Sequence, residues 1–454
     1  MELTNYLDYN EEIIQFAFKN GASQIQIAHS ISDDFDVEVR QGEIQQFNKA
    51  ISKSMGMKVL VDDRVATAST SDLRKEVVEN LVLSTIQRAK YSEADPYARL
   101  AELEQSNINS SSLNLYDPKI EELSPDWKIS QAKEMESIAL SDKRITNSLG
   151  SQFSTNISSI YLSNSNGFAG SFKSSSVSAG VFLQAGVAVG AIHELPLQSG
   201  ASDELYEEGW WENRVALEAL PPIEEIAKTA IHRTTRLIGA KKIESQKLPI
   251  IFEPNIAAEI LGFLSACVNG NNIYLNRSFL AGKLNLEIAN PIVNIIDDGL
   301  IPGGLGSRPF DSDGVPTRKT IVIENGILKS YLLGTYAARK LNMKSTGHSS
   351  GITNFILASG NLSQDALIKS IDKGILITST IGHGLNPTTG DISKGAAGMM
   401  IINGELAYPV NEFTFSGNLQ NILQNIIAIA NDPLQNSQII TPSILVKELD
   451  ISGK

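Results

Sequence analysis

The chain has 454 residues, which is long enough for two or three domains. A formal net charge of -13 argues against DNA as a direct partner, because nucleic-acid binding needs a basic face. The one cysteine, Cys267, excludes an intrachain disulfide and a cysteine-rich metal site. With no apolar run near the roughly 20 residues of a membrane span, and no signal peptide at the start, we expect a cytoplasmic protein.

The first hundred residues predict a helix, paired strands and a second helix. Apolar residues recur at helical spacing over residues 7–18. Alternating apolar residues then predict a hairpin over 35–44 and a further strand pair over 57–65. Ser71 and Asp72 are the expected N-caps of a helix whose apolar stripe covers residues 78–89. This order is typical of an α+β domain.

The next segment begins with a polar region over residues 92–126, which we interpret as a linker. A helix is expected over 129–141, followed by strands rich in Ser, Gly and Val over 157–164, 171–183 and 185–192. A plain antiparallel sheet explains these strands without any binding role. Trp210 and Trp211 suit either an interface or a core anchor.

The last part of the chain alternates strands, hairpins and helices. A buried strand at 249–253 precedes a helix over Pro254–Val268. Asn-Gly pairs at 325–326 and 403–404 predict two hairpins, and Leu419 to Ile429 carries the stripe of a last long helix. The predicted fold is α+β: an N-terminal α+β domain with a hairpin sheet (1–100), a central linker with Ser/Gly-rich strands (101–220), and a mostly antiparallel β-rich C-terminal domain with flanking helices (221–454).

Two glycine-rich segments stand out in the C-terminal part, Asp297–Arg318 and Ile381–Gly398. A long loop inside a compact domain is usually functional or disordered, and the predicted hairpin that follows Arg318 at once argues against disorder. The alternative is a surface loop that Asp–Arg pairs hold together.

Several motifs carry a family resemblance. The segment IPGG-x-GS-x-PFD-x-x-GVPTR, followed by ENG-x-L-x-x-YLL-x-x-Y-x-ARKL and STGH, resembles the TldD/PmbA family of peptidases. VEVRQGEIQ and ASTSDL near the N-terminus match the same family. Its historical name refers to modulation of DNA gyrase, which in a chain this acidic we interpret as an indirect link through peptide degradation or maturation.

The resemblance implies where a zinc site would lie. TldD-type members carry His-Glu-x-x-x-His on the helix that matches Pro254–Val268, with two zinc-binding histidines and a glutamate as general base. Here the aligned positions are Ala258, Glu259 and Phe263, so both histidines are missing. The later cysteine ligand of the family is also absent. This departure, with the segments TSTIGHGLNPTTGDISKGAAG and ELAYPVNEFTFSG, resembles the PmbA branch, also called TldE.

The residues offer little other chemistry. The five histidines are scattered, and His383 between Gly382 and Gly384 is the best single candidate, against a structural or solvent-facing role. No Gly-x-Ser-x-Gly elbow and no P-loop motif is present.

The resemblance therefore implies a non-catalytic partner subunit of a heteromeric zinc peptidase acting on unfolded peptides. Zinc would belong to a TldD-type partner, with no cofactor in this chain. The expected cavity-lining residues are Gly303, Gly304, Gly306, Gly382, His383 and Gly384.

Two alternatives remain open at the level of sequence. One is an autonomous hydrolase that uses Glu259, His383, Asp391 and Lys394. The other is a homodimeric peptide-binding scaffold without a metal.

Overall fold

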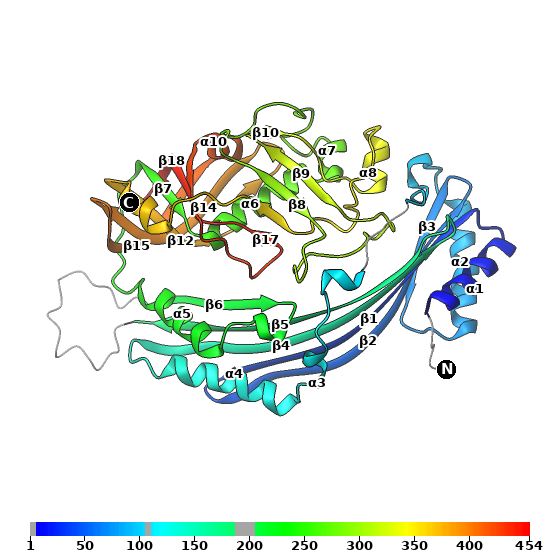
Figure 1. The fold of residues 1–454 in the computed structure, drawn as a ribbon, viewed down its shortest axis with the longest axis horizontal. Helices are drawn as coiled ribbons and strands as arrows, with labels where there is room; N and C mark the ends of the chain where they lie inside the picture. Colours follow the sequence, from blue (N-terminus) through cyan, green and yellow to red (C-terminus); the bar gives the residue numbers. More distant parts are fainter. Residues whose placement is uncertain (1–5, 105–109, 187–204) are drawn as a thin grey trace.

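The computed structural model describes residues 6–104, 110–186 and 205–454. Figure 1 shows a long curved sheet with a compact C-terminal unit on one face and helices on the other. The predicted α+β class is confirmed. No helix in the described ranges is long and apolar enough to cross a membrane.

The curved sheet contains six antiparallel strands in the order β3-β2-β1-β4-β5-β6. They are β1 (Gln24–Arg40), β2 (Glu43–Val61), β3 (Arg64–Thr70), β4 (Ile145–Asn164), β5 (Ala169–Ala185) and β6 (Tyr206–Arg214). The predicted hairpin turn at Gln41-Gly42 joins β1 to β2. Strands from both sides of residue 100 thus share one sheet, with β6 at its edge. Most of the strand expected over 185–192 lies outside the described residues.

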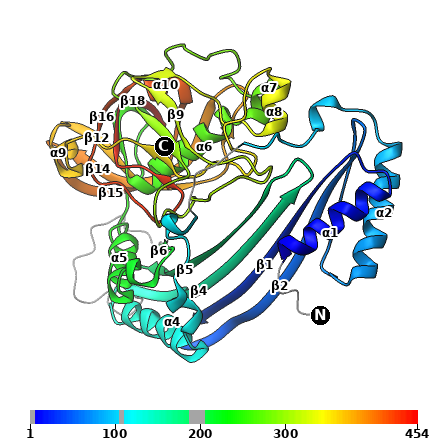
Figure 2. The same ribbon diagram turned by 45° about the vertical axis from the view of Figure 1, so that its right-hand side comes forward.

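Helices cover one face of this sheet. They are α1 (Tyr6–Lys19), α2 (Lys75–Tyr91), α3 (Pro118–Glu122), α4 (Pro125–Leu140) and α5 (Ile223–Thr235). Short 3₁₀ turns lie at Pro96–Ala98, Ser110–Leu113 and Leu217–Ala219, and the carbonyl of Leu113 accepts a hydrogen bond from Gly303 on the opposite side of the sheet. Strand β1 contacts helices at both ends of this layer through every second residue. Ile25 and Ile27 near its start pack under α1 and α2, and Val37 and Val39 near its end pack with α4. Figure 2 shows α1 and α2 at one end of the sheet and α4 with α5 at the other.

The start of α2 differs from the prediction. The helix begins at Lys75 after Arg74, whose side chain does not cap it. Asp72 instead accepts hydrogen bonds from the Arg74 backbone and side chain, at 3.1 and 3.0 Å to its Oδ1, while its own backbone N–H bonds Thr70. A carboxylate engaged in a turn of its own cannot cap a helix that begins three residues later.

The C-terminal unit contains two sheets. The smaller is β10-β9-β8-β11-β17, built from β8 (Ile295–Asp298), β9 (Lys319–Glu324), β10 (Ile327–Leu328), β11 (Phe355–Leu357) and β17 (Ile439–Ile440). The larger contains β7 (Gln246–Phe252), β12 (Lys373–Ile381), β13 (Leu385–Asn386), β14 (Asp391–Ile402), β15 (Glu405–Asn418), β16 (Ile426–Ile429) and β18 (Ile444–Ser452). Because β12 pairs with both β7 and β14, this sheet closes on itself.

Helix α6 (Pro254–Val268) lies in the core of this unit, with the predicted bounds. Its stripe of Ile260, Leu264 and Cys267 is fully or nearly fully buried, and Pro254 starts it at a position where no backbone N–H is needed. The other helices of the unit are α7 (Gly270–Tyr274), α8 (Thr335–Lys340), α9 (Gln364–Lys369) and α10 (Leu419–Gln424).

Two predicted elements of this unit are wrong. The long helix over Leu419–Ile429 is the short α10 followed by strand β16, which pairs with β18. The spacing of the apolar residues is compatible with a helix or a strand. The β-branched residues Ile426 and Ile429 form a strand because they pair with the buried strand β18. The loop expected over Ile381–Gly398 is a short loop only in its first half, because β14 begins at Asp391.

The glycine-rich segment Asp297–Arg318 connects the C-terminal unit to the curved sheet. Phe310 packs its ring edgewise against Phe168 and Phe172, with ring centroids 5.0 and 5.3 Å apart. Arg318 binds Glu104 at 2.9 Å. These contacts hold the segment against the β4–β5 turn and the start of β5, on the face of the sheet opposite its helices.

Candidate functional site

The helix that the family resemblance singled out carries an ion pair. Glu259 projects from α6, accepts a 2.7 Å hydrogen bond from Thr380 of β12 and pairs with the ammonium group of Lys394 on β14. Phe263 is buried in the core of the unit, and Ala258 is half-buried. The structure thus brings together Glu259 and Lys394, two of the four residues that the autonomous-hydrolase hypothesis named.

These residues do not fit a zinc ion. The side chains of Ala258 and Phe263 have no lone pair to donate, and the carboxylate of Glu259 already has a cationic partner. Within the described ranges, no group of three or more His, Cys, Asp or Glu side chains is placed to hold a metal. Cys267 is buried in the apolar core of the unit, where burial raises the pKa of its thiol to about 12.

A hollow of about 480 Å³ lies beside this helix, between α6 and the edge strand β6. Three carboxylates and one guanidinium line it, those of Glu207, Glu208, Glu259 and Arg233. Its apolar walls come from Phe182 and Trp211, whose exposed fractions are 46% and 41%. We call this hollow the acidic end, since three carboxylates and one guanidinium line it, with Lys394 pairing with Glu259 from outside the lining.

Four buried charged residues hold the strand β6 against the C-terminal unit. Arg233 of α5 donates to Glu208 of β6 at 2.7 Å and to Glu253, just before α6, at 2.9 Å. Arg236 donates twice to the same Glu253, at 2.6 and 3.0 Å. A third bond from Arg233 reaches the carbonyl of Thr378 on β12 at 2.7 Å. The prediction from sequence missed this cluster, because no local pattern joins residues this far apart in the chain.

The side chains of this cluster are largely shielded from solvent. Its side chains are 8 to 12% exposed, and Glu208 Oε2 and Arg236 Nε have no hydrogen-bond partner in the described part of the chain. Burial raises the pKa of Glu208, while the neighbouring arginines act in the opposite direction. The guanidinium of Arg233 also lies 4.8 Å from the ring centre of Trp210. Trp210 therefore packs against the core and this cluster as well as bordering the acidic end, whereas the more exposed Trp211 lines the hollow from the other face of β6.

A second hollow, of about 460 Å³, lies on the other side of Trp211. Its lining comes from β4, β5 and β6, from the glycine-rich segment, and from the loop between β16 and β17, which we call the late loop. The neutral polar residues and glycines of the lining are Asn156, Ser174, Ser175, Ser176, Asn213, Gly304, Gly306, Ser307, Asn436, Ser437 and Gln438, and the apolar ones include Leu115, Phe172, Val215 and Leu305. Arg308 is the only charged residue of this lining. We call this hollow the arginine end.

The two hollows meet at Trp211, Asn436 and Ser437, which line both. Asn436 donates a 3.1 Å hydrogen bond to the backbone carbonyl of Trp211, joining the late loop to the edge strand. We refer to the two hollows together as the β6 cleft. It runs between the curved sheet and the C-terminal unit, which face each other in Figure 1.

The glycine-rich segment is held in shape by a buried polar network. Asp297 accepts a 2.8 Å bond from His348 Nε2 and bonds from the backbone and hydroxyl groups of Thr353. Asp311 accepts from the backbone N–H groups of Val315 and Ser349, at 3.0 and 2.9 Å, and burial raises the pKa of its carboxyl group. His348 is thus a structural residue that ties two loops together.

Gly306 shows why this loop needs glycine. A Cβ atom there would overlap the backbone carbonyl of Thr353. Gly304 lies beside Ser307 and Asn354. Both glycines line the arginine end, and Gly303 lies next to them at a positive φ of 68° without lining it.

The second set of predicted site residues lies elsewhere. Gly382, His383 and Gly384 are exposed in the turn after β12, and neither hollow of the β6 cleft includes them. Asp391 is exposed, and hydrogen bonds from Thr389 and Asn418 lower the pKa of its carboxyl group. His193 and Glu194 lie outside the described residues.

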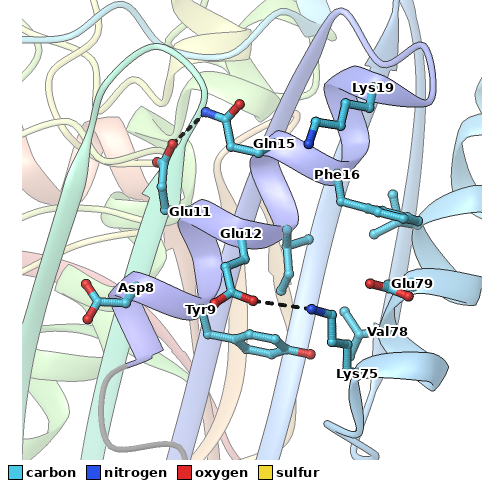
Figure 3. A pocket seen from close by; sticks show the side chains of 12 residues that line it. Asp8, Tyr9, Glu11, Glu12, Gln15, Phe16, Lys19, Lys75, Val78 and Glu79 are labelled. Atoms are coloured by element: carbon cyan, nitrogen blue, oxygen red, sulfur yellow. Dashed lines mark hydrogen bonds and ion pairs between the residues drawn. The ribbon is translucent and has the colours of Figure 1, made fainter.

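A further hollow of about 520 Å³ lies between α1 and α2, far along the curved sheet. Figure 3 shows Tyr9 and Val78 in its lining and an ion pair of Lys75 with Glu12, at 3.7 Å, across it. Its lining mixes both charge signs and contains none of the residues that the sequence analysis singled out.

Comparison with known proteins identifies three matching segments in the chain. Sequence profiles of the PmbA/TldA metallopeptidase family match three segments: its domain 1 at residues 26–89, its central domain at 118–238 and its C-terminal domain at 245–453. Metalloprotease PmbA of Escherichia coli O157:H7 is 32% identical, over 94% of this chain and 92% of that protein. A metalloprotease PmbA homolog of Haemophilus influenzae is 31% identical, over 97% of this chain and 94% of its own length.

Solved structures agree in fold. A Bacteroides thetaiotaomicron protein described as a candidate modulator of DNA gyrase superposes with a TM-score of 0.89 at 29% identity, covering 98% of this chain and 99% of that one. TldE from Thermococcus kodakarensis has the same fold, with a TM-score of 0.86 at 22% identity, over 98% of this chain and 100% of its own. The chain therefore belongs to the PmbA/TldD metallopeptidase family.

Proposed function

We propose that this chain is the metal-free, TldE-type subunit of a two-component peptidase. In this proposal the β6 cleft holds an unfolded peptide, and a TldD-type partner carries the zinc. Gly304 and Gly306 shape the wall of the cleft. No residue of this chain is assigned a catalytic role.

The observation that carries the proposal is the ion pair of Glu259 with Lys394. At the helix where the family resemblance places a general base beside zinc, the carboxylate is neutralised by an ammonium group and supported by Thr380. A general base must accept a proton from an activated water, whereas this carboxylate is engaged by Lys394 and Thr380, and the neighbouring positions 258 and 263 offer no side chain that could hold a metal.

The cleft itself suits an extended peptide. Strand β6 is the edge of a sheet, and neutral Ser and Asn side chains line the arginine end next to it. Peptide backbone groups need such hydrogen-bond partners when they leave water, and exposed Trp211 offers an apolar surface for a side chain. Neutral polar linings of this kind select for an extended backbone more than for a particular sequence.

A separate hydrolase site within this chain has weaker support. The structure joins Glu259 to Lys394 but leaves His383 exposed in the turn after β12 and Asp391 exposed at the start of β14, and no hydrogen bond or ion pair links either residue to that pair. A homodimeric scaffold would use the same cleft without a metal. The test below separates both from the proposal.

The test is affinity purification of the tagged chain from its native host, with mass spectrometry of co-purifying chains and metal analysis. We expect a chain of similar size that contains His-Glu-x-x-x-His, present in fixed ratio and accompanied by zinc. Recovery of the chain alone with peptidase activity would support the hydrolase, and recovery of an inactive chain alone would support the scaffold.

A matched variant makes the result specific. Lys394→Met removes the ammonium group while keeping the length of the side chain. If the pair is structural, this variant still joins the partner and the complex retains its zinc. Lys394 lying in a catalytic site of this chain would instead make the complex lose activity at unchanged zinc content.

A further inference from the structure

We infer that the β6 cleft binds short peptides in one direction, with the amino end at the acidic end and the carboxylate at the arginine end. This inference rests on the proposed function, since it assigns a polarity and a substrate class to the same cleft. The substrate class is a free peptide about six residues long, rather than an internal stretch of a protein.

The acidic end suits an ammonium group. Glu207 is exposed in its lining and shares one carboxylate oxygen with Gln184 at 2.9 Å, so its other oxygen is free to accept. Glu208 lies next to it, with Oε1 bound to Arg233 and Oε2 unpartnered within the described ranges. A peptide amino group carries three N–H donors, which match carboxylate acceptors at this position.

The arginine end suits a carboxylate. Arg308 is anchored through Nη2 alone, to the carbonyls of Gly351 and Ile352 at 2.7 and 3.0 Å. Its Nε–H has no partner among the residues that the structure describes, and no carboxylate lies within ion-pair distance of its guanidinium there. The other residues that line the hollow are neutral, so Arg308 is the one charged group that a terminal carboxylate would meet in this lining, while Asp297 and Asp311 act on the guanidinium from outside it.

The length of the cleft sets the length of the peptide. Glu208 lines the acidic end and Asn213 the arginine end, both on strand β6. Five steps of about 3.3 Å along a strand separate them by about 17 Å. An extended peptide of five or six residues has the same span, so both of its ends can reach their hollows together.

The test uses the peptide Ala-Ser-Lys-Ala-Ser-Ala with a fluorophore on the lysine side chain, in four forms: free ends, N-acetylated, C-amidated and blocked at both ends. Fluorescence anisotropy with the full chain gives the affinity of each form. We expect each blocked end to weaken binding about tenfold, because each removes one charged contact.

Two variants assign the ends. Arg308→Gln should bind the free-acid and amidated forms equally while still discriminating against N-acetylation, and Glu207→Gln should show the reverse. Arg74→Gln, which removes an exposed cation next to α2 and outside the cleft, should behave as the wild type.

The outcomes separate the inference from the proposed function. Equal binding of all four forms by the wild-type chain would overturn the polarity and leave the peptide cleft standing. No binding of any form would overturn the cleft as well. Because the four forms are compared on the wild-type chain, a variant that fails to fold does not remove the test.

Discussion

Individual buried residues define which parts of this molecule are structural. His29 of β1 is fully buried, and its Nε2 lies 2.8 Å from Asn10 Oδ1 on α1. Burial lowers the pKa of His29 to about 4. It therefore belongs to the packing between α1 and the curved sheet rather than to any site, and it makes the stability of that region depend on pH.

The sign of this dependence follows from the direction of the pKa. The folded chain holds His29 neutral, whereas an unfolded histidine titrates near 6.5. The stabilisation that comes from keeping His29 neutral is complete above pH about 6.5. The free energy of unfolding then falls by about 3 kcal/mol as the pH decreases from 6.5 through 4, because only the unfolded chain takes up the proton in this range. In denaturant titrations between pH 7 and 4, His29→Gln should flatten this part of the decrease. The exposed His383→Gln serves as control, and an equal effect of both variants would contradict the assignment.

Glu253 is the residue on which the joint between β6 and the C-terminal unit depends. Its carboxylate accepts bonds from both Arg233 and Arg236. Glu253→Ala leaves two buried guanidinium groups short of a partner, so we expect the free energy of unfolding to fall by about 3–5 kcal/mol. Glu224→Ala, which breaks the exposed pair with Lys228, should leave the free energy of unfolding nearly unchanged. Equal costs in urea titrations would show that the joint does not depend on this cluster.

At the scale of elements, local patterns predicted some features well and others poorly. Helix α6 has its predicted bounds because its stripe, its initial proline and its burial all agree. The Asn-Gly turns were equally clear, since Asn325 and Asn403 adopt positive φ as such hairpins require. The last helix was wrong because tertiary pairing with β18 overrode an ambiguous stripe. The charged cluster and Arg308 could not be foreseen, because their neighbours come from distant parts of the chain.

The glycine-rich segment gives a prediction at this scale. Gly306→Ala places a methyl group against the Thr353 carbonyl, and backbone on both sides must move. We expect a loss of about 1–3 kcal/mol in the free energy of unfolding, together with weaker peptide binding at the arginine end. Gly56→Ala, where no heavy atom lies within 4 Å of the new Cβ, is the control and should be neutral or stabilising. A neutral Gly306→Ala would mean that the loop adapts to the added methyl group.

Helix α6 gives a second prediction at this scale. Installing histidines in Ala258→His/Phe263→His should not create a zinc enzyme, because Lys394 still occupies Glu259 and no thiolate is near. Replacing the buried Phe263 should also lower the free energy of unfolding by about 3–5 kcal/mol, as for other deletions of large side chains from a core. Metal analysis after dialysis should find far less than one zinc per chain. One equivalent of zinc with peptide cleavage would show that only the two histidines were missing.

For the whole molecule, the curved sheet is the frame on which the C-terminal unit is mounted. The sheet carries helices on one face, and on the other the glycine-rich segment and the late loop complete the β6 cleft. Neither part contains the whole cleft. The chain has a formal net charge of -13, and the charges that line the cleft are unevenly distributed: carboxylates line one end, and Arg308 lines the other.

The most direct measurement is reconstitution of peptidase activity from purified chains. This chain, the TldD-type chain of the same organism and their mixture would each be assayed for zinc and for cleavage of an unfolded peptide. We predict no zinc and no cleavage for this chain alone, and cleavage by the mixture with zinc held by the TldD-type chain. Stoichiometric zinc and peptide cleavage in this chain alone would contradict the account.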